Sequence, residues 1–442
     1  MQINQLTLTN FRGFADYSLP LTPQFNLIVG DNSTGKTTLL DALAILASGV
    51  VVDRARAVGR SRPIKPEEVR QATFRHADTL TLEPQFPCVV GGQGKVAGES
   101  GSWKCSLTAE NGMDWQGASW VNGIARKLHD EVKHGDPVAL PLVSYYGTER
   151  LWVQASRKNG AGAYRSESRL GGYRQCLDPA SDQERLLDWF RDQEFASLQQ
   201  KKEIPTLEAC RRAIATCVPG SKHIYFDASL KQLVVGLDDA SLPITYLSDG
   251  YRNMLTIVAD LAIRCATLNP HFESEAALQT SGIVLIDELD LHLHPKWQRQ
   301  VVTDLMKAFP KLQFVGTTHS PFVIQSLPPS DSVQLINLDD RSKEHIQDKS
   351  VEDIAEWVQG VPLPQRSHRY LEMMNKAEEY FEMLADDTTA TEQQRQTARK
   401  ELEKVAMPFS DSPAYHALIK MQELAAQKQS ATGNPSAQGG AP

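Results

Sequence analysis

The sequence lacks the features that mark membrane-spanning, exported and disulfide-linked proteins. It contains no run of 18 or more apolar residues, so we expect no transmembrane helix. Its first residues do not show the basic and then apolar pattern of a signal peptide. The six cysteines form no Cys-x-x-Cys pair, which argues against zinc and disulfide frameworks. Together these absences predict a cytoplasmic protein that does not contact a membrane.

Excess positive charge, internal repeats and long coiled-coil heptads are also missing. A net charge of -8 over 442 residues argues against general coating of nucleic acid. The hydrophobic fraction of 41% and the charged fraction of 23% are ordinary for a globular protein. The length allows two or three compact units. Residues 427–442 are rich in Gly, Ser, Gln and Pro, which predicts a disordered tail.

What the sequence does contain is a phosphate-binding loop near its start. An apolar strand at 25–29 runs into a G-x-x-x-x-G-K-[ST] segment, and a helical pattern follows at 37–47. Glycines let successive backbone N–H groups face one anion, the lysine neutralises phosphate charge, and the threonine hydroxyl suits Mg²⁺. We therefore expect ATP and Mg²⁺ to bind here, through Gly30, Asn32, Ser33, Thr34, Gly35, Lys36, Thr37 and Thr38.

A second apolar strand, 283–286, ends in two carboxylates, Asp287 and Glu288. Ligands bind at the carboxyl ends of strands in open α/β sheets. We expect Asp287 to hold Mg²⁺ together with Thr37, and Glu288 to polarise the water that attacks the anhydride. A buried acidic pair without a cation would be costly. In the following turn, His292 and His294 offer an alternative, half of a separate metal site.

Two further polar turns adjoin apolar elements. Ser248-Asp249-Gly250 opens a helix at 249–268, and Thr318-His319-Ser320 follows a strand at 312–317. Ser248 can donate to a phosphate while Gly250 permits close backbone approach. A structural alternative exists for each: Ser248 as a helix N-cap, and His319 as the cap of the helix that starts beside it.

In this order the motifs resemble the ABC/SMC/RecF class of ATPases, to which the OLD-type proteins are related. The resemblance implies that the Ser-x-Gly turn of a second copy completes each ATP site, so the protein is a homodimer or a higher oligomer. It implies that residues 290–295 are a D-loop and that His319 senses the γ-phosphate. Asn10-Phe11-Arg12-Gly13 resembles the start of these ATPases, which implies that Arg12 lies near the nucleotide, unless this is only a surface turn. A glutamine expected in the loop at 145–150 is missing.

The expected fold is α/β, an ABC/SMC-type P-loop ATPase head with a mixed sheet, a helical insertion and a C-terminal helical region. Alternation of helix and strand after residue 249 supports this. The expected divisions are an N-terminal lobe with the phosphate loop and a basic, β-rich insertion (1–150), a linker and helical insertion (151–245), a C-terminal lobe with the remaining motifs (246–345), a helical partner-binding region (346–426) and the disordered tail (427–442).

The whole layout most resembles the PtuA-type ATPases of Septu anti-phage systems and the similar ATPases encoded beside some retrons. Residues 143–152, 350–354 and 360–362 add to this resemblance. It implies a separate HNH-type nuclease as partner. OLD-type nucleases carry an acidic metal site with a D-x-D element after the ATPase motifs. The residues after His319 offer only the pair Asp339-Asp340, so a built-in nuclease is not expected. Two alternatives stay open: a RecF-like DNA-repair ATPase, and a slowly hydrolysing ATP-bound scaffold that holds a partner inactive.

Two stretches, 53–75 and 150–174, are rich in arginine and lysine. Basic side chains in Gly- and Ser-rich loops can follow a phosphate backbone without reading bases. They suggest contact with DNA or with a retron RNA–DNA hybrid. The alternative is that both stretches are solvated loops that are basic for no special reason.

Overall fold

The computed structural model divides the chain into two compact units, residues 1–359 and 360–442. No relative placement of the two units is implied by this division. The structure describes residues 1–51, 62–76, 79–110, 112–114, 116–151, 168–178, 183–238, 240–339, 349–361, 364–385, 391–409 and 421.

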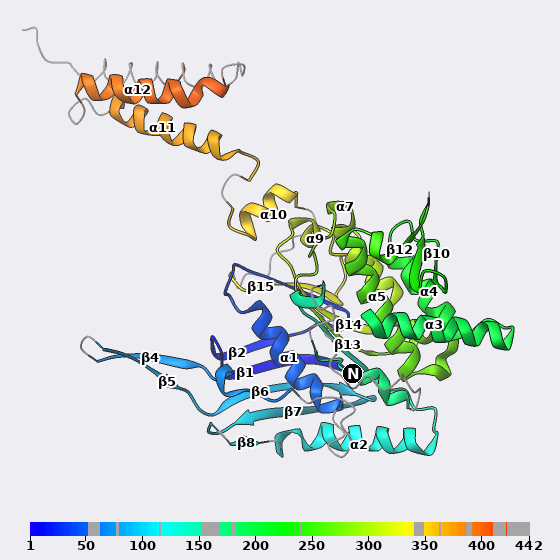
Figure 1. Ribbon diagram of the computed structural model, residues 1–442. Helices are drawn as coiled ribbons and strands as arrows, with labels where there is room; N and C mark the ends of the chain where they lie inside the picture. Colours follow the sequence, from blue (N-terminus) through cyan, green and yellow to red (C-terminus); the bar gives the residue numbers. More distant parts are fainter. Residues whose placement is uncertain are drawn as a thin grey trace, which may run out of the picture. The chain divides into compact units, whose positions relative to one another are not determined.

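A five-stranded parallel sheet forms the centre of the first unit, in the order β15-β3-β14-β13-β9 (Figure 1). Every position of β3, β9, β13 and β14 is buried, as expected of parallel strands covered on both faces. Strands β3 and β9 come from the expected N-terminal lobe, and β13, β14 and β15 come from the expected C-terminal lobe. The two lobes therefore share one central sheet. The bounds are β3 (Phe25–Val29), β9 (Leu142–Tyr146), β13 (Gly282–Ile286), β14 (Leu312–Thr317) and β15 (Val333–Asn337).

An antiparallel sheet, ordered β2-β1-β6-β7-β8, forms a second layer. Helix α1 (Lys36–Val51) contacts strands of both sheets and is buried continuously from Leu39, which explains its nearly all-apolar sequence. The indole of Trp103 donates to the carbonyl of Leu46 at 3.0 Å, which ties α1 to the antiparallel layer. The bounds are β1 (Gln2–Phe11), β2 (Phe14–Pro20), β6 (Cys88–Val96), β7 (Glu99–Leu107), β8 (Met113–Asp114) and α2 (Ser119–His134), which packs against α1 and β7.

The insertion between β3 and β9 differs from the sequence expectation. The pattern predicts one strand over 79–90, but Pro84 and Pro87 interrupt it, because proline has no N–H to donate to a ladder. The segment instead forms the end of a hairpin, β4 (Gln71–His76) with β5 (Thr79–Pro84), followed by β6. The hairpin extends away from the body of the unit (Figure 1).

The helical insertion is also more divided than its pattern suggests. The expected block 181–216 is two helices, α3 (Gln183–Gln200) and α4 (Pro205–Cys217), with Pro205 in the first turn of the second. A three-stranded sheet follows, made of β10 (His223–Asp227), β11 (Gln232–Gly236) and β12 (Ser241–Pro243).

Helix α5 (Asp249–Leu268) agrees with the sequence prediction at both ends. The expected helix 295–308 is broken into α7 (Pro295–Gln298) and α8 (Val301–Ala308). Short helices α6 (Ala276–Gln279), α9 (Pro321–Gln325) and α10 (Val351–Trp357) complete the first unit. The 3₁₀ turns are η1 (Pro66–Glu68), η2 (Gln116–Ala118), η3 (Thr148–Leu151), η4 (Arg169–Tyr173), η5 (Ile244–Tyr246), η6 (Pro270–Glu275) and η7 (Met407–Phe409), the last in the second unit.

The second unit contains the helix pair α11 (His368–Ala385) and α12 (Glu392–Ala406). They pack through a small apolar core of Met373, Ala377, Tyr380 and Leu402. Thr391 caps α12 by a reciprocal hydrogen-bond pair with Gln394. Helix α10 belongs to the first unit, where it packs on α9. The boundary between the two units therefore lies within the expected helical region 346–426, after its first residues. Residues 427–442 lie outside the described residues. Of the helices that the structure describes, none has the length and hydropathy to cross a membrane.

Candidate nucleotide site

The phosphate loop lies between the end of β3 and the first turn of α1, as its motif predicts. Three of its residues have positive φ: Gly30 at 152°, Ser33 at 70° and Gly35 at 103°. A Cβ atom on Gly35 would lie 2.7 Å from the Phe14 ring, so the loop can pack against β2 only with glycine here. The curled backbone at the start of α1 is the arrangement that receives an anion.

Lys36 is folded back over this loop. Its Nζ donates to the carbonyls of Gly30 and Asp31, both at 2.7 Å. Burial lowers the pKa of Lys36, while the negative charges of Asp339, Asp287, Asp31 and Glu288 oppose that shift. The ammonium group is thus partly desolvated and surrounded by carboxylates, and an arriving phosphate would meet a cation held close to the loop.

The hydroxyl of Thr37 donates to Oδ2 of Asp287 at 2.9 Å, which joins the phosphate loop to the end of β13. The other carboxylate oxygen of Asp287 accepts from Thr317 Oγ1 at 2.6 Å. A hydroxyl and a carboxylate in contact are hard oxygen donors that fit Mg²⁺, which usually takes one or two carboxylates and completes its shell with water and phosphate oxygens. Thr37 and Asp287 are therefore suited to hold the ion.

Glu288 follows Asp287 with a positive φ of 47°, so the chain turns sharply as β13 ends. Its N–H donates to Thr317 Oγ1 at 2.8 Å, and its side chain is half-buried. Thr317 thereby fixes both carboxylate residues at once. A constrained backbone beside residues suited to hold a metal ion is typical of a residue whose side-chain direction matters for chemistry.

The Ser-Asp-Gly turn packs directly on the expected D-loop of the same chain. A Cβ atom on Gly250 would lie 2.5 Å from the carbonyl oxygen of His292, so only glycine fits there. Asn253 Nδ2 also donates to the carbonyl of Leu291 at 2.8 Å. Within the described segment 240–339, the exposed Ser248 makes no side-chain capping bond to α5. Ser248 thus heads the helix without capping it, which leaves its hydroxyl for another role.

The loop after β14 brings His319 to the surface. Thr318 Oγ1 donates to Asp290 Oδ1 at 2.5 Å, and the His319 N–H donates to the same oxygen at 3.4 Å. The cap of α9 is Ser320, whose hydroxyl accepts from the N–H groups of Phe322 and Val323. His319 is therefore not the helix cap, and its exposed side chain is held through its backbone.

The two histidines of the D-loop take different local roles. His294 Nδ1 accepts from the N–H of Lys296 at 3.2 Å and so caps α7. His292 has a positive φ of 61° and approaches Gly250 through its backbone. In the part of the chain that the structure describes, no three His, Cys, Asp or Glu side chains are placed to hold a metal ion.

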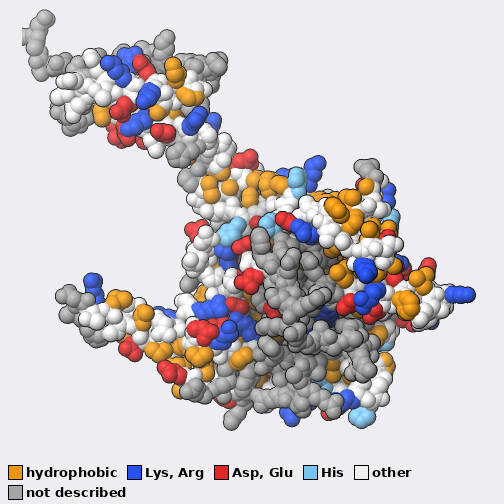
Figure 2. All heavy atoms as spheres, viewed as in Figure 1, with side chains coloured by type: hydrophobic (Ala, Val, Ile, Leu, Met, Phe, Trp, Pro, Cys, Tyr) orange, Lys and Arg blue, Asp and Glu red, His pale blue; other side chains and the backbone are white. Residues whose placement is uncertain are grey.

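Arg12 takes part in a four-residue ion cluster that the sequence pattern does not reveal. Arg12 and Arg62 each contact both Asp41 and Glu68, at N–O distances from 2.7 to 2.9 Å. Asp41 lies on α1, the helix that begins with Lys36 and Thr37. Figure 2 shows acidic and basic side chains gathered where the β4–β5 hairpin leaves the body. Contact of Arg12 with the nucleotide stays a prediction.

Burial raises the pKa of Glu68, but hydrogen bonds from Arg62 and Lys65 and the charges of Arg62 and Arg12 outweigh it, so its pKa is lowered. Replacing Glu68 with alanine removes a buried carboxylate that two half-buried arginines share and is expected to reduce the free energy of unfolding by about 3 kcal/mol. Because the folded-state pKa is depressed, this stability is present above the unfolded pKa of about 4.3 and is lost as pH falls through the folded pKa. Urea unfolding followed by circular dichroism at pH 7 measures the first effect, and a series of pH values running below the unfolded pKa measures the second.

The matched control is the neighbouring Glu67→Ala. The Glu67 side chain is 69% exposed and meets only Lys65, at 3.8 Å, among the ion pairs described for it. The Glu67→Ala substitution is expected to lower the free energy of unfolding by less than about 0.5 kcal/mol. Equal urea midpoints for the two variants at pH 7 would show that the cluster does not stabilise the fold.

Asp339 is a further site residue that sequence reasoning missed. Its Oδ2 accepts from the N–H of Asp31 at 2.7 Å, which braces the phosphate loop from the end of β15. The side-chain oxygen of Asn337 accepts from the N–H of Asp339 at 3.0 Å. Because β15 pairs with β3, the two turns that follow these strands lie side by side. Knowledge that β15 pairs with β3 would have allowed the contact between Asp339 and the phosphate loop to be predicted.

At the end of β9, just before the loop in which a glutamine was expected, the structure has a tyrosine tied inward. Tyr146 donates to Asp260 on α5 at 2.6 Å, and Arg264 donates to the same carboxylate oxygen at 2.6 Å. Burial raises the pKa of Asp260, but the charges of Arg264 and Arg185 reverse this, so its pKa is lowered. This buried network joins β9 to α5 and leaves the missing glutamine unidentified.

Some arginines of the two basic stretches form hydrogen bonds or ion pairs with other parts of the protein. Arg169 donates to the carbonyls of Leu268 and Asp136, each at 2.9 Å, and also to that of Val138. Together with Arg62, it serves the fold rather than a phosphate backbone. The basic residues at 54–60 and 157–165 lie outside the described residues.

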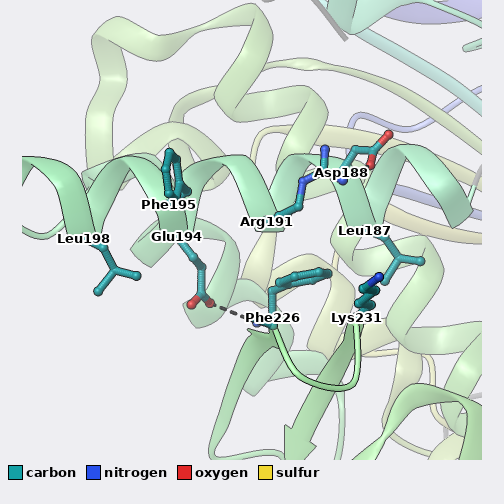
Figure 3. Close-up of a pocket in the computed structure, with 9 residues that line it drawn as sticks. Leu187, Asp188, Arg191, Glu194, Phe195, Leu198, Phe226 and Lys231 are labelled. Carbon is teal, nitrogen blue, oxygen red and sulfur yellow. Dashed lines mark hydrogen bonds and ion pairs between the residues drawn. The ribbon is translucent and has the colours of Figure 1, made fainter. Parts of the chain in front are cut away.

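A separate cavity of about 730 Å³ lies between α3 and the β10–β11 turn (Figure 3). Phe195 and Leu198 on its α3 wall are 59% and 76% exposed, and Phe226 lies across from them. Glu194 accepts from the N–H of Phe226 at 3.2 Å, which ties the helix to β10. None of the residues predicted to bind the nucleotide lines this cavity.

Comparison with known proteins gives matches along most of the chain. Residues 1–71 match a family model described as "AAA ATPase domain", and residues 154–325 match one described as "AAA domain, putative AbiEii toxin, Type IV TA system". The Retron Ec83 probable ATPase of Escherichia coli is 39% identical over 28% of this chain and 22% of its own length. The Septu protein PtuA of Bacillus thuringiensis is 28% identical over 85% of this chain and 88% of its own length.

The chain spans less than half the length of the first three curated relatives that it matches. Among solved structures, the SMC head domain from Thermotoga maritima is similar, with 14% identity, a TM-score of 0.41, and coverage of 75% of this chain and 97% of that one. The fold of this chain is therefore described by its own strand order, β15-β3-β14-β13-β9 in the central sheet.

Proposed function

We propose that this chain, an ABC/SMC-like P-loop ATPase related to the ATPases of retron and Septu systems, binds ATP with Mg²⁺ between two copies, hydrolyses it and controls a partner nuclease. The observation that supports ATP hydrolysis best is the line of contacts from Thr37 through Asp287 and Thr317 to Glu288. It connects the group that would hold phosphate-bound Mg²⁺ with the group that would activate water.

We assign each residue of the site a role in ATP binding or hydrolysis from its position. The loop N–H groups and Lys36 bind the phosphates, and Thr37 and Asp287 hold Mg²⁺. Mg²⁺ held there would neutralise negative charge on the phosphates. Glu288 orients a water and accepts its proton as the water oxygen bonds to the γ-phosphorus. The bond from that phosphorus to the bridging oxygen breaks, and ADP leaves with the electron pair. His319 would contact the γ-phosphate from the loop after β14.

A second copy supplies the remaining groups. The Ser248 hydroxyl is exposed at the start of a 20-residue helix, where the backbone N–H groups favour an anion. Gly250 fixes this turn on the D-loop, so the turn and the D-loop would move together toward a partner's phosphate. The resulting assembly is a homodimer or a higher oligomer with two shared sites in each pair of copies.

The role in defence is supported by the relatives named for retron and Septu systems. We propose an HNH-type nuclease as the partner, with helices α11 and α12 as its contact region. ATP state would then decide whether the nuclease is held inactive or released. Nucleic acid is a further proposed ligand of the basic stretches.

The nuclease role is tested by expressing the full chain together with its neighbouring genes, among which we expect one for an HNH-type nuclease. We expect the two to purify as a complex, and DNA cleavage by the complex to differ about tenfold or more between ATP and no nucleotide. Lys36→Ala should abolish the ATP effect while keeping the complex. Nuclease activity that is the same with and without this chain would contradict control of the nuclease, and would leave ATP hydrolysis to be judged by its own assay.

A further inference from the structure

The last residues of the first unit are hydrogen-bonded to the loops of the nucleotide site. Gln359 Nε2 donates to the carbonyl of His319 at 2.6 Å. One residue earlier, the carbonyl of Val358 accepts from Asn337 Nδ2 at 3.3 Å. The side-chain oxygen of Asn337 binds the N–H of Asp339, whose carboxylate binds the phosphate loop. The chain end of this unit therefore contacts the loop after β14 directly, and it reaches the phosphate loop through Asn337 and Asp339.

His319 is held by its backbone from two sides. Asp290 of the D-loop accepts its N–H, and Gln359 donates to its carbonyl. The imidazole itself is exposed, and these two backbone bonds hold the residue that carries it. The N–H of the peptide that follows His319 also donates to Thr318 Oγ1 at 3.0 Å, so loss of the Gln359 bond would leave this peptide tied at one end and would loosen the direction of the ring.

Gln359 is itself well anchored. Its N–H and that of Val358 both donate to the carbonyl of Ile354, at 3.2 and 2.9 Å, in the last turn of α10. Ile354 is fully buried, and α10 packs on α9, the helix that starts beside His319 (Figure 1). Gly360 follows with a positive φ of 66°, and there the chain passes into the second compact unit. A displacement at residue 360 thus acts on the residue that holds His319.

We propose that Gln359 is a positioning residue for His319, and that through it the junction with the C-terminal unit is coupled to the γ-phosphate end of the ATP site. The inference rests on the proposed function only in that His319 acts on the γ-phosphate. Because coupling free energy is reciprocal, a partner that pulls on the junction changes ATP turnover, and ATP changes the junction.

The test uses Gln359→Met in the full-length chain, since methionine keeps the length of the side chain and removes its donor. We expect kcat for ATP hydrolysis to fall about five- to tenfold, the effect of one lost hydrogen bond, while KM stays within about twofold. The matched control is Gln325→Met, because Gln325 Nε2 also donates to a backbone carbonyl, that of Lys349, at 3.1 Å. It should leave both constants unchanged.

A second measurement follows the junction itself. In the hydrolysis-deficient Glu288→Gln background, hydrogen exchange of amides 351–360 is expected to slow with ATP relative to ADP. Adding Gln359→Met should remove that difference, and adding Gln325→Met should keep it. An unchanged kcat for Gln359→Met, or a raised KM with a lowered melting temperature, overturns the positioning role. If the wild-type chain itself hydrolyses no ATP, the proposed function fails first, and this inference fails with it.

Discussion

Replacing Glu288 with glutamine is expected to lower kcat for ATP hydrolysis by about a hundred- to thousandfold, the usual contribution of a general base. Glutamine keeps the size and can still touch a water, but it does not accept the proton. The affinity for ATP should change by less than about twofold, because Lys36 and the loop N–H groups bind the phosphates in either variant. Phosphate release gives kcat, and a fluorescent ATP analogue gives the dissociation constant.

The control for this substitution is Glu99→Gln, which makes the same chemical change at an exposed position of β7. It should behave as the wild type in both measurements. Hydrolysis that is unchanged in Glu288→Gln would remove Glu288 from the catalytic role and would favour a chain that holds ATP as a scaffold. A loss of ATP binding would instead mean that Glu288 supports the shape of the loop.

Mixing two inactive variants is expected to restore ATP hydrolysis. Lys36→Ala disables the phosphate loop and Ser248→Arg blocks the turn that a partner would insert, so each variant alone should be almost inactive. In a mixed dimer, one site joins the intact phosphate loop of one copy to the intact Ser248 turn of the other. Random pairing in equal amounts leaves about a quarter of all sites intact, because a two-fold symmetric dimer contains two equivalent sites.

Recovery near that level requires that the two motifs act across copies. If Ser248 served the phosphate loop of its own chain, each polypeptide in the mixture would carry one fatal defect and no activity would return. A double variant that carries both changes in one chain, mixed with wild type, is the control. Size-exclusion chromatography with ATP should also show that Ser248→Arg forms less dimer than the wild type.

The sequence predicted the elements that carry chemistry, because local pattern determines them. The apolar runs that became β3, β13 and β14 each end in the polar residues that the motifs require. Helix α5 was predicted at both ends, since its apolar stripe and the Ser-Asp-Gly turn are continuous in sequence. The P-loop ATPase class and the relationship to retron and Septu ATPases were also predicted correctly.

Contacts between distant residues could not be predicted in this way. Arg12 and Glu68 are 56 residues apart, and neither residue has a pattern that identifies its partner. Asp339 looked like one half of a weak acidic pair, and only the pairing of β15 with β3 brings it to the phosphate loop. The breaks at Pro84 and between α7 and α8 were missed because apolar periodicity continues across them.

The central sheet has a consequence for how the protein is made. Strand β3 leaves the ribosome early, but Asn26 bonds to Phe314, 288 residues later, and Asp31 bonds to Asp339, 308 residues later. Such long-range pairing is slow, and it waits for the last strand. A nascent chain therefore carries the whole phosphate-loop sequence long before it can present a braced loop to ATP. Nucleotide competence depends on the synthesis of β15, which brings Asp339 to the phosphate loop.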